Sequence, residues 1–390
     1  MPRRKRKRGE KTKVSVLIPC LNEERTVGNV VRDARKELQK NGFEPEVIVD
    51  DGASTDDSVN EACKAGAIVI KEGERGYGDA YLTMIERATG DVFVLADGDG
   101  TYPMRFLPKF VKPILKGKDF VMGTRLKGKI EKNAMPLLHR YLGNPILTLI
   151  LNLLLGASVS DVCCGMRSYS KEKIRALNLS AGGMDFAAEL LIKSLKRRYL
   201  YAEVPITYKK REVEKSKLNS FGDGWILLRM MLLLSPTWLF IYPGLISFML
   251  GLAIAAFSLT SKIELFGRSM DVSATIIGSF LAIVGIQTIF FGLSAKIYSV
   301  INNFEMPGKT YAFINDYFSL EKGLLLGTLF IICGLIASLS LFPYWLQKVF
   351  TLSGLKLGII SSSAIIIGLQ VFLSSFFISI IHIKKNKKSN

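Results

Sequence analysis

The chain has 390 residues, with 52 Lys and Arg against 34 Asp and Glu, and a formal net charge of +18. Its basic runs lie at Arg3–Arg8, within 193–217 and at Lys384–Lys388 and accompany no nucleic-acid-binding motif, so the charge favours an anionic membrane surface over DNA or RNA. Two histidines, His139 and His382, and five cysteines without CxxC spacing argue against a His-based metal cluster, a Ser-His-Asp triad and a disulfide framework.

The composition changes near residue 225, where a charged segment gives way to long apolar runs with short polar loops. This change predicts a soluble domain followed by a membrane domain. In chain order we expect a solvated basic tail at 1–12, an α/β domain at 13–220, a juxtamembrane interfacial segment at 221–237, and a transmembrane domain of four helices with a basic C-terminal tail at 238–390.

Strand and helix patterns alternate regularly through the soluble half. Such alternation predicts a mostly parallel sheet with helices on both faces, a fold in which ligands bind at the carboxyl ends of the strands. The expected elements are strand 13–19, helix 24–40, strand 45–50, helix 55–64, strand 67–71, helix 77–89, strand 92–96, helix 103–115 and strand 119–122.

Two carboxylates, Asp50 and Asp51, follow the second expected strand and lie on opposite sides of its end. The first strand ends at the same edge with the polar run 19–24. A carboxylate at this edge suits the ring N–H of either a uracil or a guanine. The same residues also fit an Asx turn and a helix N-cap at 54–57.

The fourth expected strand runs directly into Asp97-Gly98-Asp99. Two carboxylates with this spacing can face the same way and share Mg²⁺ or Mn²⁺, which prefer oxygen ligands and keep positions for water and phosphate. Such a metal would neutralise the charge that develops on a leaving diphosphate. The pattern also occurs in ordinary loops, and its position after a buried strand beside the Asp50-Asp51 edge favours the metal site.

A glycine-rich segment, Gly73 to Gly78, precedes the third expected helix. Its GxxGxG spacing and its place after the third strand argue against a dinucleotide-binding fingerprint, which is GxGxxG after the first strand. Gly76 and its neighbours either let the backbone approach a sugar or phosphate, or form a plain loop.

Asp185 and Glu189 lie one helical turn apart and could both face a sugar. An ordinary helix start, with an acidic residue near the positive end of the helix dipole, explains Asp185 equally well.

The apolar segment 142–155 is shorter than the roughly 20 residues that cross a bilayer. A core helix of the soluble domain is one interpretation. The other is an interfacial helix resting on lipid, which would suit an acceptor anchored in the membrane.

Four longer apolar stretches predict membrane spans. The connection 296–322 and the C-terminal tail carry more Lys than 261–272 and 343–357, so the positive-inside rule puts both termini and the soluble domain in the cytoplasm. The expected spans are 238–260, 273–295, 323–342 and 358–383.

Residues 13–218 resemble the GT-A domain of family 2 glycosyltransferases, in particular the branch of dolichyl-phosphate mannose synthase and related polyprenyl-phosphate transferases. The motifs that carry the resemblance follow one another in the family's order. They are PCLNEE from Pro19, VDDGASTDDS from Val49, ADGDGTYP from Ala96, Gly123-Thr124-Arg125, DVCCGMR from Asp161, and Pro205-Ile206-Thr207 through Arg211 to Ser216-Lys217-Leu218.

The resemblance implies a metal-dependent enzyme that transfers a hexose, with inversion, from GDP-mannose, UDP-glucose or UDP-N-acetylglucosamine to dolichyl or another polyprenyl phosphate. A lipid monophosphate is largely ionised near pH 7, with a second pKa of about 6, so no strong general base is required. By the same resemblance the nucleotide sugar is held by Pro19, Leu21, Glu23, Asp50, Asp51, Gly76, Asp97 and Gly98, the metal by Asp97, Asp99 and Thr101, and catalysis depends on Asp99, Arg125, Arg211 and Lys217.

Departures from the family's motifs weaken the assignment of mannose: Gly98 replaces Ala, Thr101 stands where Gln is frequent, and Cys163-Cys164 replaces a Thr-Ser type pair. Two other functions stay open. A processive polysaccharide synthase would carry an acceptor motif such as Q-x-x-R-W, which the chain lacks near its tryptophans. A lipid or sugar transporter with a nucleotide-binding regulatory domain would carry ionisable residues in its spans, and the four stretches have almost none. The sequence predicts no oligomeric state.

Overall fold

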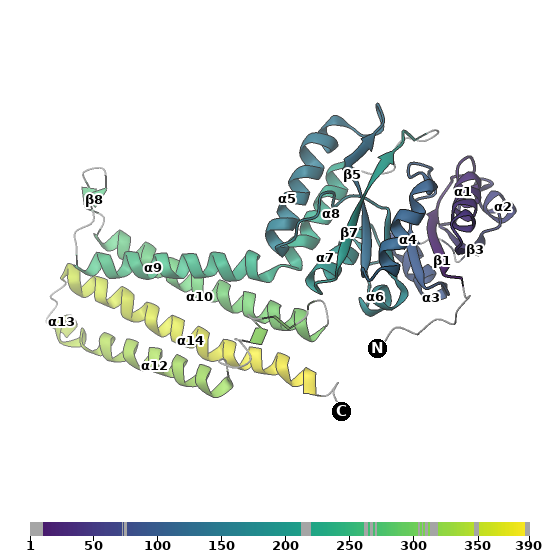
Figure 1. Cartoon of the computed structure of the whole chain (residues 1–390). Helices are drawn as coiled ribbons and strands as arrows, with labels where there is room; N and C mark the ends of the chain where they lie inside the picture. The colour runs from purple at the N-terminus through teal and green to yellow at the C-terminus, as the bar shows by residue number, and fades with distance from the viewer. Residues whose placement is uncertain are drawn as a thin grey trace. The chain divides into compact units, whose positions relative to one another are not determined.

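The chain divides into two compact units, Met1–Met231 and Leu232–Asn390, and each is considered by itself. The first holds the sheet and the second holds the long apolar helices (Figure 1). The computed structural model describes residues 11–71, 73, 76–211, 220–260, 264–265, 268–269, 271–302, 305, 307–308, 311–312, 319–346 and 351–386.

A seven-stranded mixed sheet forms the centre of the first unit, in the order β3-β2-β1-β4-β6-β5-β7. Strands β1 to β4 are parallel to one another, β6 is antiparallel to β4 and β5, and β7 is parallel to β5. The predicted α/β fold with a mostly parallel sheet is confirmed. The strands are β1 (Lys13–Cys20), β2 (Glu44–Asp51), β3 (Ile68–Lys71), β4 (Val92–Leu95), β5 (Phe120–Ile130), β6 (Arg167–Ser170) and β7 (Tyr201–Tyr208).

Helices cover both faces of this sheet. Val16 and Ile18 of β1 share one core with Val31 of α1 and Phe110 of α4, while α3 packs against β1 and β2. A strand buried on both faces reads as a mostly apolar run, and in β1 only Lys13 and Ser15 interrupt it. The helices are α1 (Val27–Lys40), α2 (Ser58–Lys64), α3 (Tyr77–Arg87), η1 (Met104–Phe106), α4 (Leu107–Leu115), η2 (His139–Gly143), α5 (Asn144–Leu155), α6 (Lys171–Ala176), α7 (Phe186–Lys196) and α8 (Ser220–Leu233).

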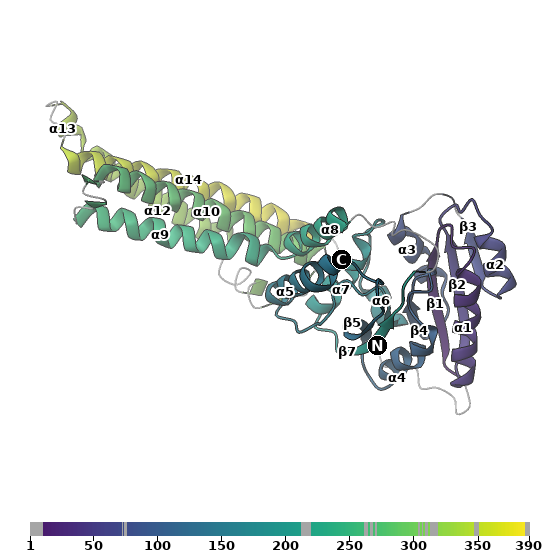
Figure 2. The same cartoon turned by 90° about the horizontal axis from the view of Figure 1, so that it is seen from above.

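Helix α5 is not part of that core. It lies on the β5 side of the unit, away from α1 and α2 (Figures 1 and 2). Its buried residues are Asn144, Thr148 and Leu151, whereas Leu149 and Leu153 are each 58% exposed. The interpretation of 142–155 as a core helix is therefore wrong, because only Leu151 of its apolar side chains is buried, whereas Leu142, Ile146, Leu149 and Leu153 are exposed.

The second unit contains four helices long and apolar enough to span a membrane, over Thr237–Leu259, Val272–Ile301, Leu320–Leu339 and Leu352–Ile381. They run alongside one another in both views (Figures 1 and 2) and confirm the prediction of four spans. The elements of the unit are η3 (Thr237–Ile241), α9 (Tyr242–Thr260), β8 (Glu264–Leu265), β9 (Arg268–Ser269), α10 (Asp271–Ile301), α12 (Leu320–Leu339), α13 (Phe342–Leu346) and α14 (Leu352–Asn386).

Glycines bring these helices together in two pairs. A Cβ placed on Gly251 of α9 would lie 2.4 Å from the Ala282 nitrogen of α10, and one on Gly327 of α12 would lie 2.7 Å from the Gly368 oxygen of α14. Backbones that approach this closely gain van der Waals contact, which drives helix association in lipid.

A buried polar cluster joins β1, β2 and the turn before β4. The Glu46 carboxylate accepts hydrogen bonds from the Ser15 hydroxyl and from the Thr89 nitrogen (2.9 Å) and hydroxyl (2.5 Å), and it pairs with the Lys13 ammonium at 2.9 Å. Burial opposes ionisation, but the hydrogen bonds outweigh it and lower the pKa of Glu46 to about 2.

We expect Glu46→Gln to destabilise the protein by about 1–3 kcal/mol at pH 7, because it removes the charge on which these hydrogen bonds depend. Because the pKa of Glu46 is lower in the folded state than in the unfolded state, its charged form stabilises the fold at pH values above the unfolded-state pKa near 4.5. This contribution is lost as the pH falls from there to about 2. Unfolding measured at pH 7 and pH 3 should therefore show the difference from wild type shrinking at pH 3. Glu44→Gln, an exposed position on the same strand, is the control and should change little at either pH.

Candidate active site

A tight loop after β4 carries Asp97 and Asp99. Strand β4 lies between β1 and the antiparallel β6, so this loop occupies the point where the parallel part of the sheet ends. The Asp99 Oδ1 accepts hydrogen bonds from the Thr101 nitrogen (3.0 Å) and hydroxyl (2.6 Å), and Gly100 takes a positive φ of 74° that closes the turn. The Tyr77 hydroxyl donates to Asp97 Oδ1 at 3.4 Å.

The surroundings of Asp97 disfavour a negative charge on its carboxylate. Burial, followed by the charge of Asp99, raises the pKa of Asp97 to about 7. Among the described residues no third Asp, Glu, His or Cys joins them in a metal-binding group. Two carboxylate donors that leave further positions to water and phosphate oxygens fit Mg²⁺ or Mn²⁺.

Arg211 follows the end of β7 and forms an ion pair with Asp99. Its Nε and Nη2 are 2.7 and 2.6 Å from Asp99 Oδ2. The segment that carries Arg211 is fixed to the same loop, because the Lys209 nitrogen donates to the Thr101 oxygen at 3.0 Å. The structure thus brings together two residues separated by 112 positions in the chain.

Glu23 reaches the same loop from the end of β1. A Cβ placed on Gly98 would lie 2.2 Å from Glu23 Oε2, so the absence of a side chain at position 98 makes room for this carboxylate. The replacement of Ala by Gly in the motif therefore has a local physical reason. It places a residue of the expected nucleotide loop beside the expected metal loop.

Asp50 and Asp51 lie at the same edge, since Pro19 and Cys20 of β1 pair with them across the sheet. Both aspartates are buried. Each Asp51 oxygen lies 3.3 Å from the Ser54 nitrogen. The Asx turn forms further along, where the Ser58 nitrogen donates to Asp56 Oδ1 at 3.0 Å. The turn interpretation therefore holds at Asp56, and contact of Asp50 or Asp51 with a base stays a prediction.

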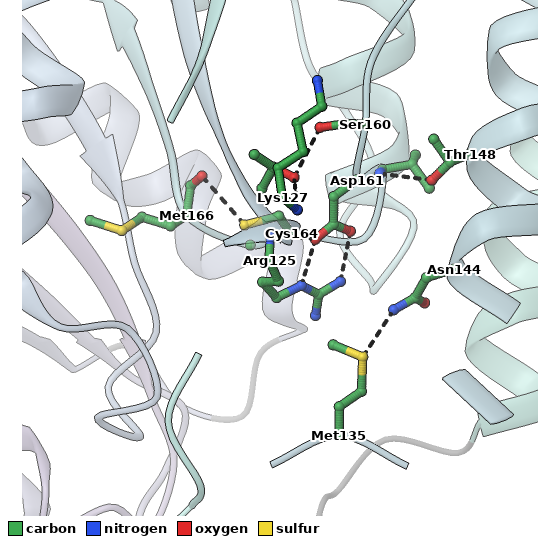
Figure 3. A network of polar contacts seen from close by, with 12 residues as sticks. Arg125, Lys127, Met135, Asn144, Thr148, Ser160, Asp161, Cys164 and Met166 are labelled. Atoms are coloured by element: carbon green, nitrogen blue, oxygen red, sulfur yellow. Dashed lines mark hydrogen bonds and ion pairs between the residues drawn. The ribbon is translucent and has the colours of Figure 1, made fainter. Parts of the chain in front are cut away.

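Arg125 forms a buried ion pair with Asp161 (Figure 3). Its Nε donates to Asp161 Oδ2 and its Nη2 to Oδ1, each at 2.8 Å, and its backbone nitrogen donates to Oδ2 at 2.9 Å. The guanidinium also lies 5.3 Å from the centre of the Tyr208 ring. Its donors therefore hold the segment after Ser160 against β5, and its contact with a phosphate stays a prediction.

Helix α5 is tied to the segment that carries Asp161. Asn152 exchanges hydrogen bonds with the backbone of Val159 (2.8 and 3.0 Å). The Val162 nitrogen donates to the Thr148 hydroxyl at 3.2 Å, and Figure 3 shows Thr148 in this bond. Thr148 and Asn152 thus face the segment that pairs with Arg125, whereas Asn144 of the same helix donates to Met135 Sδ at 3.5 Å (Figure 3).

The glycines of the 73–78 segment are explained in part by packing. A Cβ on Gly76 would lie 2.1 Å from the Gly182 oxygen, and one on Gly78 would lie 2.2 Å from the Ala181 oxygen. Close approach of two backbones therefore requires both glycines. A contact of Gly76 with the nucleotide sugar stays a prediction.

The sequence suggested that Glu189 faces a sugar, but the structure gives its carboxylate other partners. Its carboxylate accepts hydrogen bonds from the backbone nitrogens of Ser180 and Ala181 (3.0 and 2.9 Å) and pairs with Lys193 at 2.6 Å. Asp185 accepts a hydrogen bond from the Gly183 nitrogen at 3.2 Å. Both carboxylates order the loop that covers the start of α3.

Six of the thirteen predicted site residues converge on the loop after β4. Tyr77 and Asp161 were not singled out: a tyrosine carries no sequence signal, whereas Asp161 belongs to a recognised motif without an assigned role. Lys217 lies outside the described residues. The converging residues are Glu23, Asp97, Gly98, Asp99, Thr101 and Arg211.

Two parts of the chain match known families. Residues 15–177 match the family described as glycosyl transferase family 2. Residues 293–382 match the glycosyltransferase family 2 C-terminal transmembrane region.

Curated relatives extend this match. The chain is 34% identical over 368 residues to the low-salt glycan biosynthesis hexosyltransferase Agl6 of Haloferax volcanii, covering 94% of this chain and 88% of the relative. It is 36% identical over 211 residues to a dolichyl-phosphate hexose transferase of the same organism, covering 54% of this chain and 89% of the relative. It is 31% identical over 218 residues to UDP-N-acetylglucosamine–dolichyl-phosphate N-acetylglucosaminyltransferase of Methanococcus voltae, covering 50% and 84%.

Among solved structures, glucosyl-3-phosphoglycerate synthase of Mycobacterium tuberculosis in complex with Mn²⁺, UDP-glucose and phosphoglyceric acid is 25% identical. The match has a TM-score of 0.46 and covers 57% of this chain and 79% of that one.

We expect Asp161→Asn to destabilise the protein by about 3 kcal/mol, because it leaves the Arg125 guanidinium buried without its counter-charge. Asp33→Asn, the same substitution at an exposed position, should cost less than about 0.5 kcal/mol. Chemical unfolding of the full chain in detergent measures both. Equal stability of the two variants would mean that the ion pair contributes nothing to the fold.

Proposed function

Because the chain belongs to glycosyltransferase family 2, and is an integral membrane protein, we propose that it transfers a hexose from a nucleotide sugar to dolichyl or another polyprenyl phosphate. The observation that carries this proposal is the cluster of Asp97, Asp99 and Arg211 at the carboxyl edge of the sheet. Two of the relatives carry names of transferases that act on dolichyl phosphate. The product would be a lipid-linked sugar available for glycosylation.

The proposed reaction joins two anionic partners. An oxygen of the lipid phosphate attacks the anomeric carbon in line, the bond between that carbon and the donor's phosphate oxygen breaks, and the nucleoside diphosphate leaves with the electron pair. Attack from the opposite side inverts the anomeric centre. The acceptor is already ionised near neutral pH, so the site needs to orient the partners and neutralise charge, and it needs no strong base.

The residues around Asp99 divide this work. A Mg²⁺ or Mn²⁺ bound to Asp97 and Asp99 would neutralise the leaving diphosphate, with Thr101 orienting Asp99 through its hydroxyl. Arg211 supplies a cation at the same place and, in the proposal, faces a phosphate together with Arg125 and Lys217. Arg125 would do so while holding Asp161.

The nucleotide would lie along the ends of β1 and β2. Asp50 or Asp51 would accept the ring N–H of the base, with Pro19, Leu21 and Glu23 lining the same edge. Because uracil and guanine both offer such a donor, the proposal includes UDP- and GDP-sugars alike. Gly76 and Gly98 would let the backbone approach the sugar and the diphosphate.

Helix α5 and η2 support a lipid acceptor. Their exposed apolar side chains form an outward face that the described residues of the first unit leave uncovered. Exposed apolar patches of this kind mark sites of interaction, and for a membrane protein the partner at hand is the lipid surface. The side chains are Tyr141, Leu142, Ile146, Leu149 and Leu153, preceded by Leu137 and Leu138.

We propose that the catalytic unit and both termini lie in the cytoplasm. The distribution of Lys over the connections between spans supports this orientation. It also puts the site on the side where nucleotide sugars are made.

A transporter is the alternative from another class, and buried lysines in the spans bear on it. Lys356 of α14 donates to the Ser258 oxygen at 2.6 Å, and Lys296 of α10 pairs with Glu305. The first bond lies in the last turn of α9, where a cation caps the helix. Both lysines thus have structural partners, and they give the transporter little support.

The proposal predicts metal-dependent formation of a lipid-linked sugar. With short polyprenyl phosphates and a panel of GDP-mannose, UDP-glucose and UDP-N-acetylglucosamine, at least one donor should give product with Mn²⁺ and none with EDTA. Asp99→Asn should lower the rate by about 10²–10³-fold, because it weakens both the binding of the metal and the ion pair with Arg211. Asp91→Asn, at an exposed position, should not.

If no donor gives a lipid-linked product while the folded protein binds nucleotide, the acceptor assignment is wrong. Elongation of a free glycan under the same conditions would support a processive synthase instead.

A second prediction concerns the outward face of α5. Leu149→Glu should raise the KM for a long-chain acceptor in lipid nanodiscs by about tenfold, because burying one leucine in lipid is worth roughly 1.5 kcal/mol or more. Leu200→Glu makes the same change at a leucine that is 61% exposed elsewhere on the unit and serves as the control. The interfacial role would be excluded by equal KM values in the two variants.

A further inference from the structure

Both oxygens of Asp99 are already bonded by the chain's own donors. Oδ1 accepts two hydrogen bonds from Thr101, which lies two residues away in the same turn. Oδ2 is held by the Nε and Nη2 of Arg211, at 2.7 and 2.6 Å. A metal that binds Asp99 through Oδ2 must therefore displace Arg211.

The two sets of donors differ in how easily they give way. The Thr101 bonds are local and belong to the turn itself. Arg211 comes from a distant part of the chain, and its side chain is 28% exposed, whereas that of Asp99 is 8% exposed. The backbone before Arg211 is anchored, because the Lys209 backbone nitrogen donates to the Thr101 oxygen and the Lys210 backbone nitrogen donates to the Glu131 carboxylate at 3.2 Å. The guanidinium can thus change its partner while its attachment stays beside the site.

We propose that Arg211 is a temporary counter-ion of Asp99: it pairs with this carboxylate before metal binds and moves to a phosphate when metal and nucleotide bind together. This inference rests on the proposed function. A metal that arrives alone must displace Arg211 and leave a guanidinium beside a divalent cation without an anion of its own. A nucleoside diphosphate brings the anion that Arg211 then binds.

The consequence is positive coupling between the metal and the nucleotide. Each should bind more tightly in the presence of the other, by the same factor. The empty site would bind metal weakly, although it contains two neighbouring carboxylates. Arg211 would thereby make the enzyme respond to the metal–nucleotide complex and not to the metal alone.

Binding of Mn²⁺, followed by the electron paramagnetic resonance of the unbound ion, tests this in the full chain in detergent. The titration is made with and without UDP and, separately, GDP. For the wild type we expect whichever nucleotide binds to raise the affinity for Mn²⁺ by about tenfold. Arg211→Gln should bind Mn²⁺ alone about tenfold more tightly than wild type and lose most of the coupling.

Two further variants separate the contact from the charge. Arg105→Gln removes one positive charge from an exposed residue four positions after Thr101, without touching Asp99, and should keep the wild-type behaviour. Arg211→Lys keeps the charge but loses the forked pair of donors and should fall between wild type and Arg211→Gln.

The inference is overturned if Arg211→Gln and Arg105→Gln bind Mn²⁺ alone with the same affinity, or if Arg211→Gln retains the full coupling. In that case the wild type still binds metal with nucleotide and the proposed function stands. If the wild type binds no Mn²⁺ even with nucleotide, the metal site of the proposed function fails together with the inference.

Discussion

Four aspartates, Asp50, Asp51, Asp97 and Asp99, lie at one edge of the sheet, and none of them is fully exposed. Burial and the neighbouring charge of Asp99 disfavour the charged form of Asp97 and raise its pKa. Such an edge is stable only with cations or hydrogen-bond donors directed at it. Arg211 and the turn of Thr101 provide them at Asp99, and the charge that remains is what suits the site to a divalent metal carrying a diphosphate.

The fold and this edge were open to prediction because their signals are local. Alternating apolar periods identify strands and helices, and a residue that follows a buried strand must lie at the sheet edge whatever the rest of the chain does. The pairs that organise the site were not predictable in this way. Arg211 meets Asp99 across 112 residues and Arg125 meets Asp161 across 36, and a sequence gives the charges without saying which of them meet.

The errors have the same cause. Glu189 was a candidate for sugar binding because helical spacing put it beside Asp185, but its carboxylate is taken up by the Ser180–Ala181 backbone, which no local pattern reveals. Gly76 was left between a ligand contact and a plain loop, and close packing against Gly182 is an explanation that only the tertiary structure offers. Apolar content alone could not separate a core helix from an interfacial one at 142–155, because both need the same residues.

Helix α5 shows how one element can serve the membrane and the site at once. Leu149 and Leu153 face outward, whereas Thr148 and Asn152 hold the segment that carries Asp161, which in turn holds Arg125. A polar residue in an apolar helix costs stability unless it is hydrogen-bonded, so these three bonds also fix which side of the helix turns inward. The same contacts that orient the apolar face therefore set the position of the Arg125–Asp161 pair, and a displacement of the helix would be transmitted through this pair to β5.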